Sequence, residues 1–263
     1  MALEEQDLEI LRQAFETLEH PSLAARISNV VGTPIEIAAH MLPKKWYKSI
    51  HDTAEKAIVK ALDTAVTTMR RHHEVSAHET YYKALVAGSG GLGGLFGLPG
   101  IIVELPVTTT LMLRGIAEIA RDQGEDIDML ETRMACVQVF AFGGRSEIDD
   151  AAETGYYGVR LALSGYMSSV TSHIAQHGLA TDAAPVLLNM AHGVASRFGI
   201  VVSQRTALQI MPIVGAVSAA AINTIFMQHF QHMARAHFTV RRLERKYDKE
   251  FVRSQYESFK DEN

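Results

Sequence analysis

The glycine-rich segment of residues 84–103 constrains the fold of this 263-residue chain more than any other stretch. It holds seven glycines between Gly88 and Gly100, and no charged residue follows Lys83 until Glu104. Glycine costs a helix in water about 1 kcal/mol relative to alanine, so a run of glycines makes a poor isolated helix. The segment therefore needs close packing against neighbouring helices or contact with lipid.

The spacing of these glycines favours a helix over a nucleotide-binding loop. Gly90 lies four residues before Gly94, and Gly93 four residues before Gly97, so small residues share helix faces that another helix can approach closely. Residues 88–93 also read G-x-G-x-x-G, but the strand-turn-helix context of a dinucleotide site is missing. We expect one half of a helical hairpin, covered by protein or inserted into a membrane.

The rest of the chain also has helical spacing. Leu8, Leu11 and Phe15 form an apolar stripe on a first helix that ends before Pro21. No period-two pattern is long enough for a sheet, so we predict an all-α multi-helix bundle in one continuous domain, with N-terminal helices in residues 1–75 and a core in residues 76–263. Further helices are predicted at residues 35–41, 45–71, 106–124, 129–142, 146–178, from 181 or 182, 203–247 and 249–260.

Composition and charge exclude several classes of protein. The net charge is −5 and the 25 basic residues are spread along the chain, so we expect no nucleic-acid partner. The single cysteine, Cys136, rules out an internal disulfide and suits a reducing compartment. The first residues are acidic, unlike the start of a signal peptide. We therefore expect a cytoplasmic protein.

Two uncharged stretches are long enough to cross a bilayer, which needs about 20 residues. They are residues 84–103 and 206–228. The second contains polar residues, among them Asn223, that would need partners inside an apolar environment. We predict a central core helix for this stretch, with a membrane span as the alternative.

Two long motifs resemble signatures of a known family. The first contains G-L-P-G at residues 97–100 and E-L-P-V-T-T-T-L-M-L-R at residues 104–114, and the second A-H-F-T-V-R-R-L-E-R-K-Y at residues 236–247. Over roughly residues 79–256 the chain resembles the EcsC family. That family is named for a protein encoded beside an ABC transporter linked to secretion. The resemblance implies a link to transport and identifies no catalytic residue or cofactor.

Charges in the apolar helices are candidate contacts for a ligand or partner. Glu104 and Arg114 flank the apolar start of a helix, and such charges must be paired or face water. We expect buried ion pairs, with a ligand or partner contact as the alternative. Arg241, Arg242 and Arg245 end a long helix, where they can bind anionic lipid headgroups or pair with Glu244, Asp248 and Glu250.

The histidines form three groups with spacing compatible with a metal ion. None matches H-E-x-x-H, and such residues commonly form a polar face or a core network. A metal site would combine the first and third groups in space. The groups are His72, His73 and His78 with Glu74 and Glu79; His173 with His177; and His229 and His232 followed by His237.

These patterns favour a non-enzymatic accessory protein at the cytoplasmic face of the inner membrane, bound to the membrane surface or to a membrane protein complex. No cofactor other than a metal ion is expected. One alternative is a metal-dependent hydrolase that uses the histidines. The other is a binding protein for a lipid or small apolar ligand, held in a cavity between the glycine segment and the helix at Thr206.

Overall fold

The computed structural model describes residues 3–20, 23, 42–67, 98–144, 155–177, 184–209 and 216–260. Every element in these ranges is a helix, which confirms the all-α fold. Gly90, Gly94, Gly97, His72, His73, His78, Glu79 and the helix predicted at residues 35–41 lie outside the described residues. The elements are α1 (Glu5–Glu19), α4 (Lys44–Thr67), α6 (Leu98–Asp122), α7 (Leu130–Gln138), the 3-10 turn η2 (Val139–Ala141), α9 (Tyr156–His177), α10 (Ala184–Gln209), α11 (Ala216–Lys246) and α12 (Lys249–Ser258).

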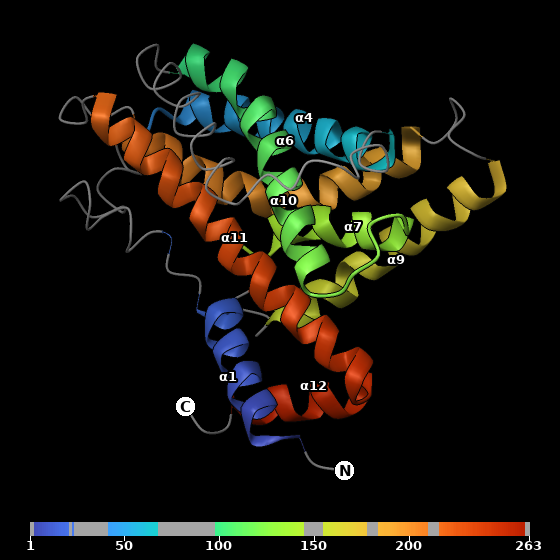
Figure 1. Ribbon diagram of the computed structural model, residues 1–263. Coiled ribbons are helices and arrows are strands. Elements are labelled where there is room, and N and C mark those ends of the chain that lie inside the picture. The colour runs from blue at the N-terminus through green and yellow to red at the C-terminus, as the bar shows by residue number, and fades with distance from the viewer. Residues whose placement is uncertain are drawn as a thin grey trace.

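The long helix α11 connects a broad upper part of the molecule to a narrower lower part (Figure 1). In the upper part, α4 packs between α6 and α10, and α7 and α9 lie beside them. In the lower part, α1 and α12 pack on the C-terminal half of α11. Elements from both ends of the chain thus cover the same central helix.

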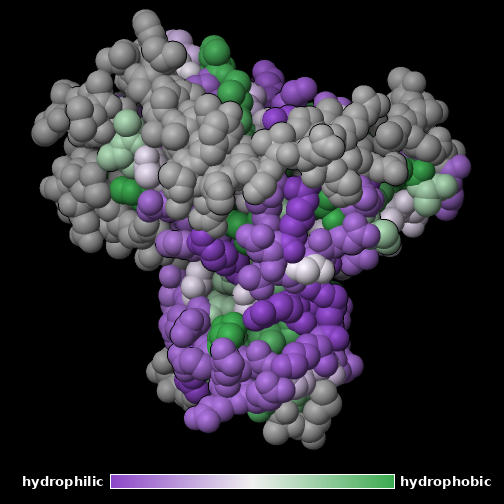
Figure 2. All heavy atoms as spheres, viewed as in Figure 1, coloured by the Kyte–Doolittle hydropathy of each residue, from purple (hydrophilic) through white to green (hydrophobic). Residues whose placement is uncertain are grey.

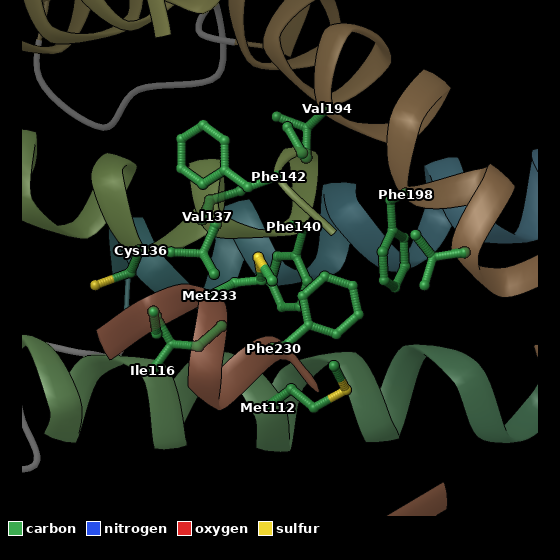
Figure 3. Close-up of a cluster of buried hydrophobic side chains, with 14 of the residues drawn as sticks. Met112, Ile116, Cys136, Val137, Phe140, Phe142, Val194, Phe198, Phe230 and Met233 are labelled. Carbon is green, nitrogen blue, oxygen red and sulfur yellow. The ribbon is translucent and has the colours of Figure 1, made fainter. Parts of the chain in front are cut away.

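The core is shared by the N-terminal helices and the remainder of the described chain. Leu11 of α1 and Ile50 of α4 belong to the same buried cluster as the residues of α6, α7, α10 and α11. At its centre the rings of Phe140, Phe198 and Phe230 meet at centroid distances of 5.1–5.6 Å (Figure 3). Such aromatic pairs add about 0.5–1.5 kcal/mol beyond their buried area.

Cys136 is a core residue. It is fully buried in α7 beside this aromatic cluster. Burial raises the pKa of its thiol well above the ordinary value, so the sulfur stays protonated and unreactive.

The apolar stripe from which α1 is predicted also packs this helix against the rest of the protein. Leu11, Phe15 and Leu18 are buried, and the ring of Phe15 lies 5.1 Å from that of Tyr256 on α12. Glu19, the last residue of α1, is buried, and its carboxylate accepts hydrogen bonds from the Tyr156 amide and the Tyr256 hydroxyl, both at 3.1 Å. This carboxylate links α1, α9 and α12.

Helix α6 begins at Leu98, well before the start predicted at Pro106. A proline inside a helix cannot donate its backbone hydrogen bond and is costly. Here Ile101, Glu104 and Leu105 are buried around Pro106, and this packing offsets the loss. The apolar segment therefore divides differently from the prediction, because residues 98–103 belong to the helix that contains Glu104.

The single helix predicted at residues 203–247 is wrong. Helix α10 ends at Gln209 and α11 begins at Ala216, with Pro212 and Gly215 in the intervening sequence. The two helices have different main neighbours, since α10 packs most on α4 and α11 most on α1 and α6. Tertiary packing thus separates two stretches that composition alone joins.

The same division changes which stretches can cross a membrane. Among the described residues, Pro99–Asp122 and Pro185–Gln209 are long and apolar enough by length and composition, a test that core helices of soluble proteins also pass. In the tested windows, 56% and 44% of the residues are buried inside the protein. The core helix predicted at residues 206–228 is split between α10 and α11, and most of the first candidate stretch, residues 84–103, lies outside the described residues.

Gly124 ends α6 as the sequence predicts. Its φ of +78° is a left-handed conformation that favours glycine. The Gly124 amide donates to the Arg121 carbonyl at 2.8 Å, and the Glu125 amide donates to the Ala120 carbonyl at 3.0 Å. These two bonds form a Schellman motif, which turns the chain sharply and carries Glu125 toward α11.

We expect Gly124→Ala to lower the free energy of unfolding by about 1–2 kcal/mol, because a side chain is strained at this φ. Gly165→Ala on α9 is the matched control, since no atom lies within 4 Å of the added methyl group. It should raise stability by about 0.5–1 kcal/mol. Urea unfolding measures both effects, and equal shifts in the two variants would contradict the assigned role of Gly124.

Candidate functional site

A buried ion pair joins α6 to α10. The guanidinium of Arg205 donates from Nη2 to Oε2 of Glu104 at 2.5 Å, and the two side chains are 1% and 6% exposed. The hydroxyl of Thr108, one turn further along α6, donates to the other carboxylate oxygen. The ion pair expected for Glu104 is thus present, and both of its oxygens are engaged.

Arg205 also contacts α11. Its guanidinium carbon lies 4.8 Å from the ring centroid of Phe226, which gives a buried cation–π contact. Its Nε and Nη1 atoms find no hydrogen-bond partner among the described residues. Donors left in this way cost about 1–3 kcal/mol each, so the position suits a water molecule or another polar group.

Gln209 and Asn223 extend the polar contact. One turn beyond Arg205, the Gln209 amide nitrogen donates to Oδ1 of Asn223 on α11 at 3.0 Å. Within the described part of the chain, Gln209 Oε1 and Thr206 Oγ1 have no hydrogen-bond partner. We name this set the Glu104 cluster: Glu104, Thr108, Arg205, Thr206, Gln209 and Asn223.

The sequence indicates Glu104 and Asn223 as candidates, but it does not indicate Arg205 or its contact with Glu104. Arg205 has the same signal as Glu104, because no Asp, Glu, Lys or Arg lies between it and Arg197 or Arg235. Arg114 does not join the cluster. It lies ten residues along α6 from Glu104, about 15 Å at the helical rise, which is too far for an ion pair.

A second cluster binds the basic end of α11 to the turn after α6. Nε and Nη2 of Arg241 donate to the two carboxylate oxygens of Glu125 at 2.8 and 3.1 Å. Arg245 also contacts Glu125, and it donates to the carbonyl of Gln123 at 2.8 Å. The turn made by Gly124 places these groups.

The acids that neutralise the basic end differ from those predicted. Glu244 pairs with Arg160 of α9, and Asp248 caps α12 by accepting two backbone hydrogen bonds. Lys246 binds Asp7 at 2.8 Å, so α1 also supplies a carboxylate. Arg242 is exposed. The paired basic residues at the end of α11 are therefore bound to acidic residues that are distant in the sequence and not to the acidic residues beside them.

Two histidines of the third group are structural. His237 is fully buried, and its Nδ1 lies 2.8 Å from the Tyr156 hydroxyl. Burial, helped by the charges of Arg160 and Arg241, lowers the pKa of His237 well below its ordinary value, so the ring is neutral. Nε2 of His229 lies 2.9 Å from the carbonyl oxygen of Gly143. Both rings are engaged with other parts of the protein.

A different set of metal-ligand side chains comes together in the described residues. His51 and Glu55 lie on α4, and His192 lies on α10. These residues are not candidates in the sequence, because the i, i+4 spacing of a histidine and a glutamate is common on solvated helix faces. Only the pairing of α4 with α10 brings His192 to them.

We expect Glu104→Gln to lower the free energy of unfolding by about 3–5 kcal/mol, because it leaves the Arg205 charge buried without a counter-ion. Combining Glu104→Leu with Arg205→Met should cost less than Glu104→Gln alone, since two apolar groups need no partner. Chemical denaturation measures the variants. Glu104→Leu and Arg205→Met made singly complete the cycle, and a loss in the double variant equal to the sum of these two single losses would contradict coupling between the pair.

The Glu125 contacts predict a pH-dependent stability. Burial alone would raise the pKa of Glu125, but the hydrogen bonds and charges of Arg241 and Arg245 outweigh it and hold the pKa below 4.5, its ordinary value. The stabilisation is therefore complete above that value and is lost as the pH falls through the folded-state pKa.

We expect Glu125→Gln to lower stability by about 1.5–3 kcal/mol at pH 7, and the difference from the unsubstituted protein to shrink as the pH falls below the ordinary carboxyl value. Glu118→Gln is the control, because its pair with Arg121 spans one turn of a partly exposed helix face and should cost at most about 1 kcal/mol. Thermal unfolding between pH 3 and pH 7 measures both. A Glu125 effect independent of pH would contradict the assignment.

The comparisons with known proteins give one match. The EcsC protein family matches residues 5–243, which include α1, α4, the Glu104 cluster and most of α11. Searches of curated proteins and of solved structures found no match. The family match covers most of the chain and extends the resemblance seen at residues 79–256 to the N-terminal helices. The chain therefore belongs to the EcsC family.

Proposed function

We propose that this protein is a non-enzymatic accessory protein that docks on the cytoplasmic face of a membrane through the start of α6. The observation that carries the proposal is a row of exposed apolar residues there. Val103 is 75% exposed, Val107 54% and Ile102 40%. We name the row the α6 apolar stripe: Pro99, Ile102, Val103, Pro106 and Val107.

The stripe occupies one face of the helix. Its members are spaced at i, i+3, i+4, i+7 and i+8, which is the pattern of an amphipathic surface. A strip of hydrophobic surface is visible at the upper end of the molecule, where α6 begins (Figure 2). The opposite face is held inside by Glu104 and Leu105. A fixed inner face therefore presents the apolar outer face to solvent.

The absence of charged residues in the sequence before the stripe supports contact with lipid at this end. Residues 84–103, which lead into the stripe, contain no Asp, Glu, Lys or Arg. The lower part of the molecule is mainly hydrophilic in the same view (Figure 2). Arg241 and Arg245 belong to that part, where Glu125 already binds them. The proposed docking thus depends on the apolar stripe and not on the basic end of α11.

The energetics favour reversible docking over a membrane span. Full burial of a valine or isoleucine contributes about 1.5–3 kcal/mol, so a few partly exposed ones support weak binding. Crossing the bilayer with α6 would expose Glu104 and separate it from Arg205, which is costly. An interfacial helix that buries only one face avoids this loss. A peripheral role is also in line with the family's link to a transporter.

We expect the protein to float with vesicles of phosphatidylethanolamine and phosphatidylglycerol, and Val103→Glu to weaken its affinity for them at least about tenfold. Loss of one buried valine removes about 1.5 kcal/mol, and 1.4 kcal/mol corresponds to a factor of ten. Leu161→Glu is the matched control, because Leu161 of α9 is 69% exposed but lies outside the stripe. It should float like the unsubstituted protein.

Two outcomes would overturn the proposal. One is unsubstituted protein that stays wholly in the soluble fraction of the vesicle experiment and of an unwashed lysate. The other is equal flotation of Val103→Glu and Leu161→Glu, which would place the lipid contact elsewhere. Circular dichroism of both variants checks that the helices remain folded.

A further inference from the structure

Three potential metal ligands meet where α4 packs against α10. The ligand atoms of His51, Glu55 and His192 all lie within 4.8 Å of one another. Nδ1 of His192 is 3.9 Å from Oε1 of Glu55, and the two imidazole centroids are 6.3 Å apart. The group contains two histidines and one carboxylate, each from a helix and none from a loop.

The packing of the two helices places these side chains together. His51 and Glu55 are four residues apart and share a face of α4. Helix α10 passes along this face in the opposite direction, so His51 lies near Gly199 and Glu55 near His192. A Cβ atom added at Gly199 would lie 3.1 Å from Nδ1 of His51. Glycine at this position therefore leaves room for the imidazole between the helices.

We propose that His51, Glu55 and His192 bind one divalent transition-metal ion, with Zn²⁺ as the best fit. Two imidazoles and a carboxylate are an established zinc ligand set, and imidazole suits zinc, copper and nickel better than calcium or magnesium. Tetrahedral zinc with bonds of about 2.0–2.1 Å places its ligand atoms about 3.3 Å apart. The observed separations therefore need to close by at most about 1.5 Å, a change within reach of side-chain rotation.

The site leaves room for a fourth ligand. A hollow of about 370 Å³ is lined by His51, Ser196 and Gly199, and one of about 820 Å³ by Glu55, Val59 and Leu188. Both hollows lie along α4 and α10, and each is bordered by one of the three ligands. Zinc sites with three protein ligands and an open position bind water there and can exchange it for a small molecule. The site does not involve the α6 apolar stripe.

Elemental analysis of the full-length chain, without a histidine tag and after removal of metal with a chelator, tests the proposal. After incubation with ZnCl₂ and gel filtration, we expect about one zinc ion per chain. Co²⁺ bound at the same position should give the visible absorption of a tetrahedral site. His192→Ala and Glu55→Gln should each weaken Zn²⁺ binding, measured by calorimetry, by more than about tenfold, the smallest loss seen when even a supporting residue is removed.

The control is His232→Ala, which removes an exposed histidine of α11 that the sequence made a candidate ligand. It should leave zinc binding unchanged. The side chain of His192 is 68% exposed, so its removal should leave the helices intact, which circular dichroism checks. Less than about 0.2 zinc per chain in the unsubstituted protein would overturn the proposal. So would a Zn²⁺ affinity that is unchanged in His192→Ala or lowered in His232→Ala.

Discussion

The contact between Glu104 and Arg205 is the constraint on which the arrangement of the upper helices depends. Two opposite charges are withdrawn from water, and neither is tolerated there without the other. The pair therefore selects the face that α6 turns toward α10, and Phe226 on α11 adds a third wall around the guanidinium. With Ile101, Glu104 and Leu105 buried on one side of α6, Val103 and Val107 lie on the side that faces solvent.

Features of the fold that depend on neighbouring residues can be predicted from the sequence, and features that depend on distant residues cannot. Local periodicity predicts α1, α7 and α12, and Gly124 is recognisable as a helix end, because each depends on neighbours within a few residues. The predicted start of α6 at Pro106 is wrong. The hydrogen bond that a proline removes from a helix can be foreseen from the local sequence, but the packing of Ile101, Glu104 and Leu105 that offsets this loss depends on the tertiary structure. Glu104 could be identified as a charge needing a partner, yet nothing in its own segment indicates that the partner is Arg205.

Charge patterns show this limit most clearly. The basic end of α11 contains Arg241, Arg242 and Arg245. From composition alone, a lipid contact and a solvated face explain this helix end equally well. In the fold, a turn 116 residues earlier supplies Glu125 to Arg241 with two hydrogen bonds. That turn exists because Gly124 accepts a left-handed conformation. A backbone property of one residue thus decides whether two distant arginines are available to other molecules.

Helix α10 connects the two parts of the molecule for which we propose a function. It carries Arg205, which holds α6, and thirteen residues earlier His192, which faces α4. At the helical rise these positions are about 20 Å apart, too far for direct electrostatic coupling in salt. A metal ion that binds the folded protein and not the unfolded chain would shift the equilibrium toward the folded protein and so stabilise the packing of α4 on α10. Because α4 also packs on α6, that ion would reinforce the scaffold behind the apolar stripe without touching it.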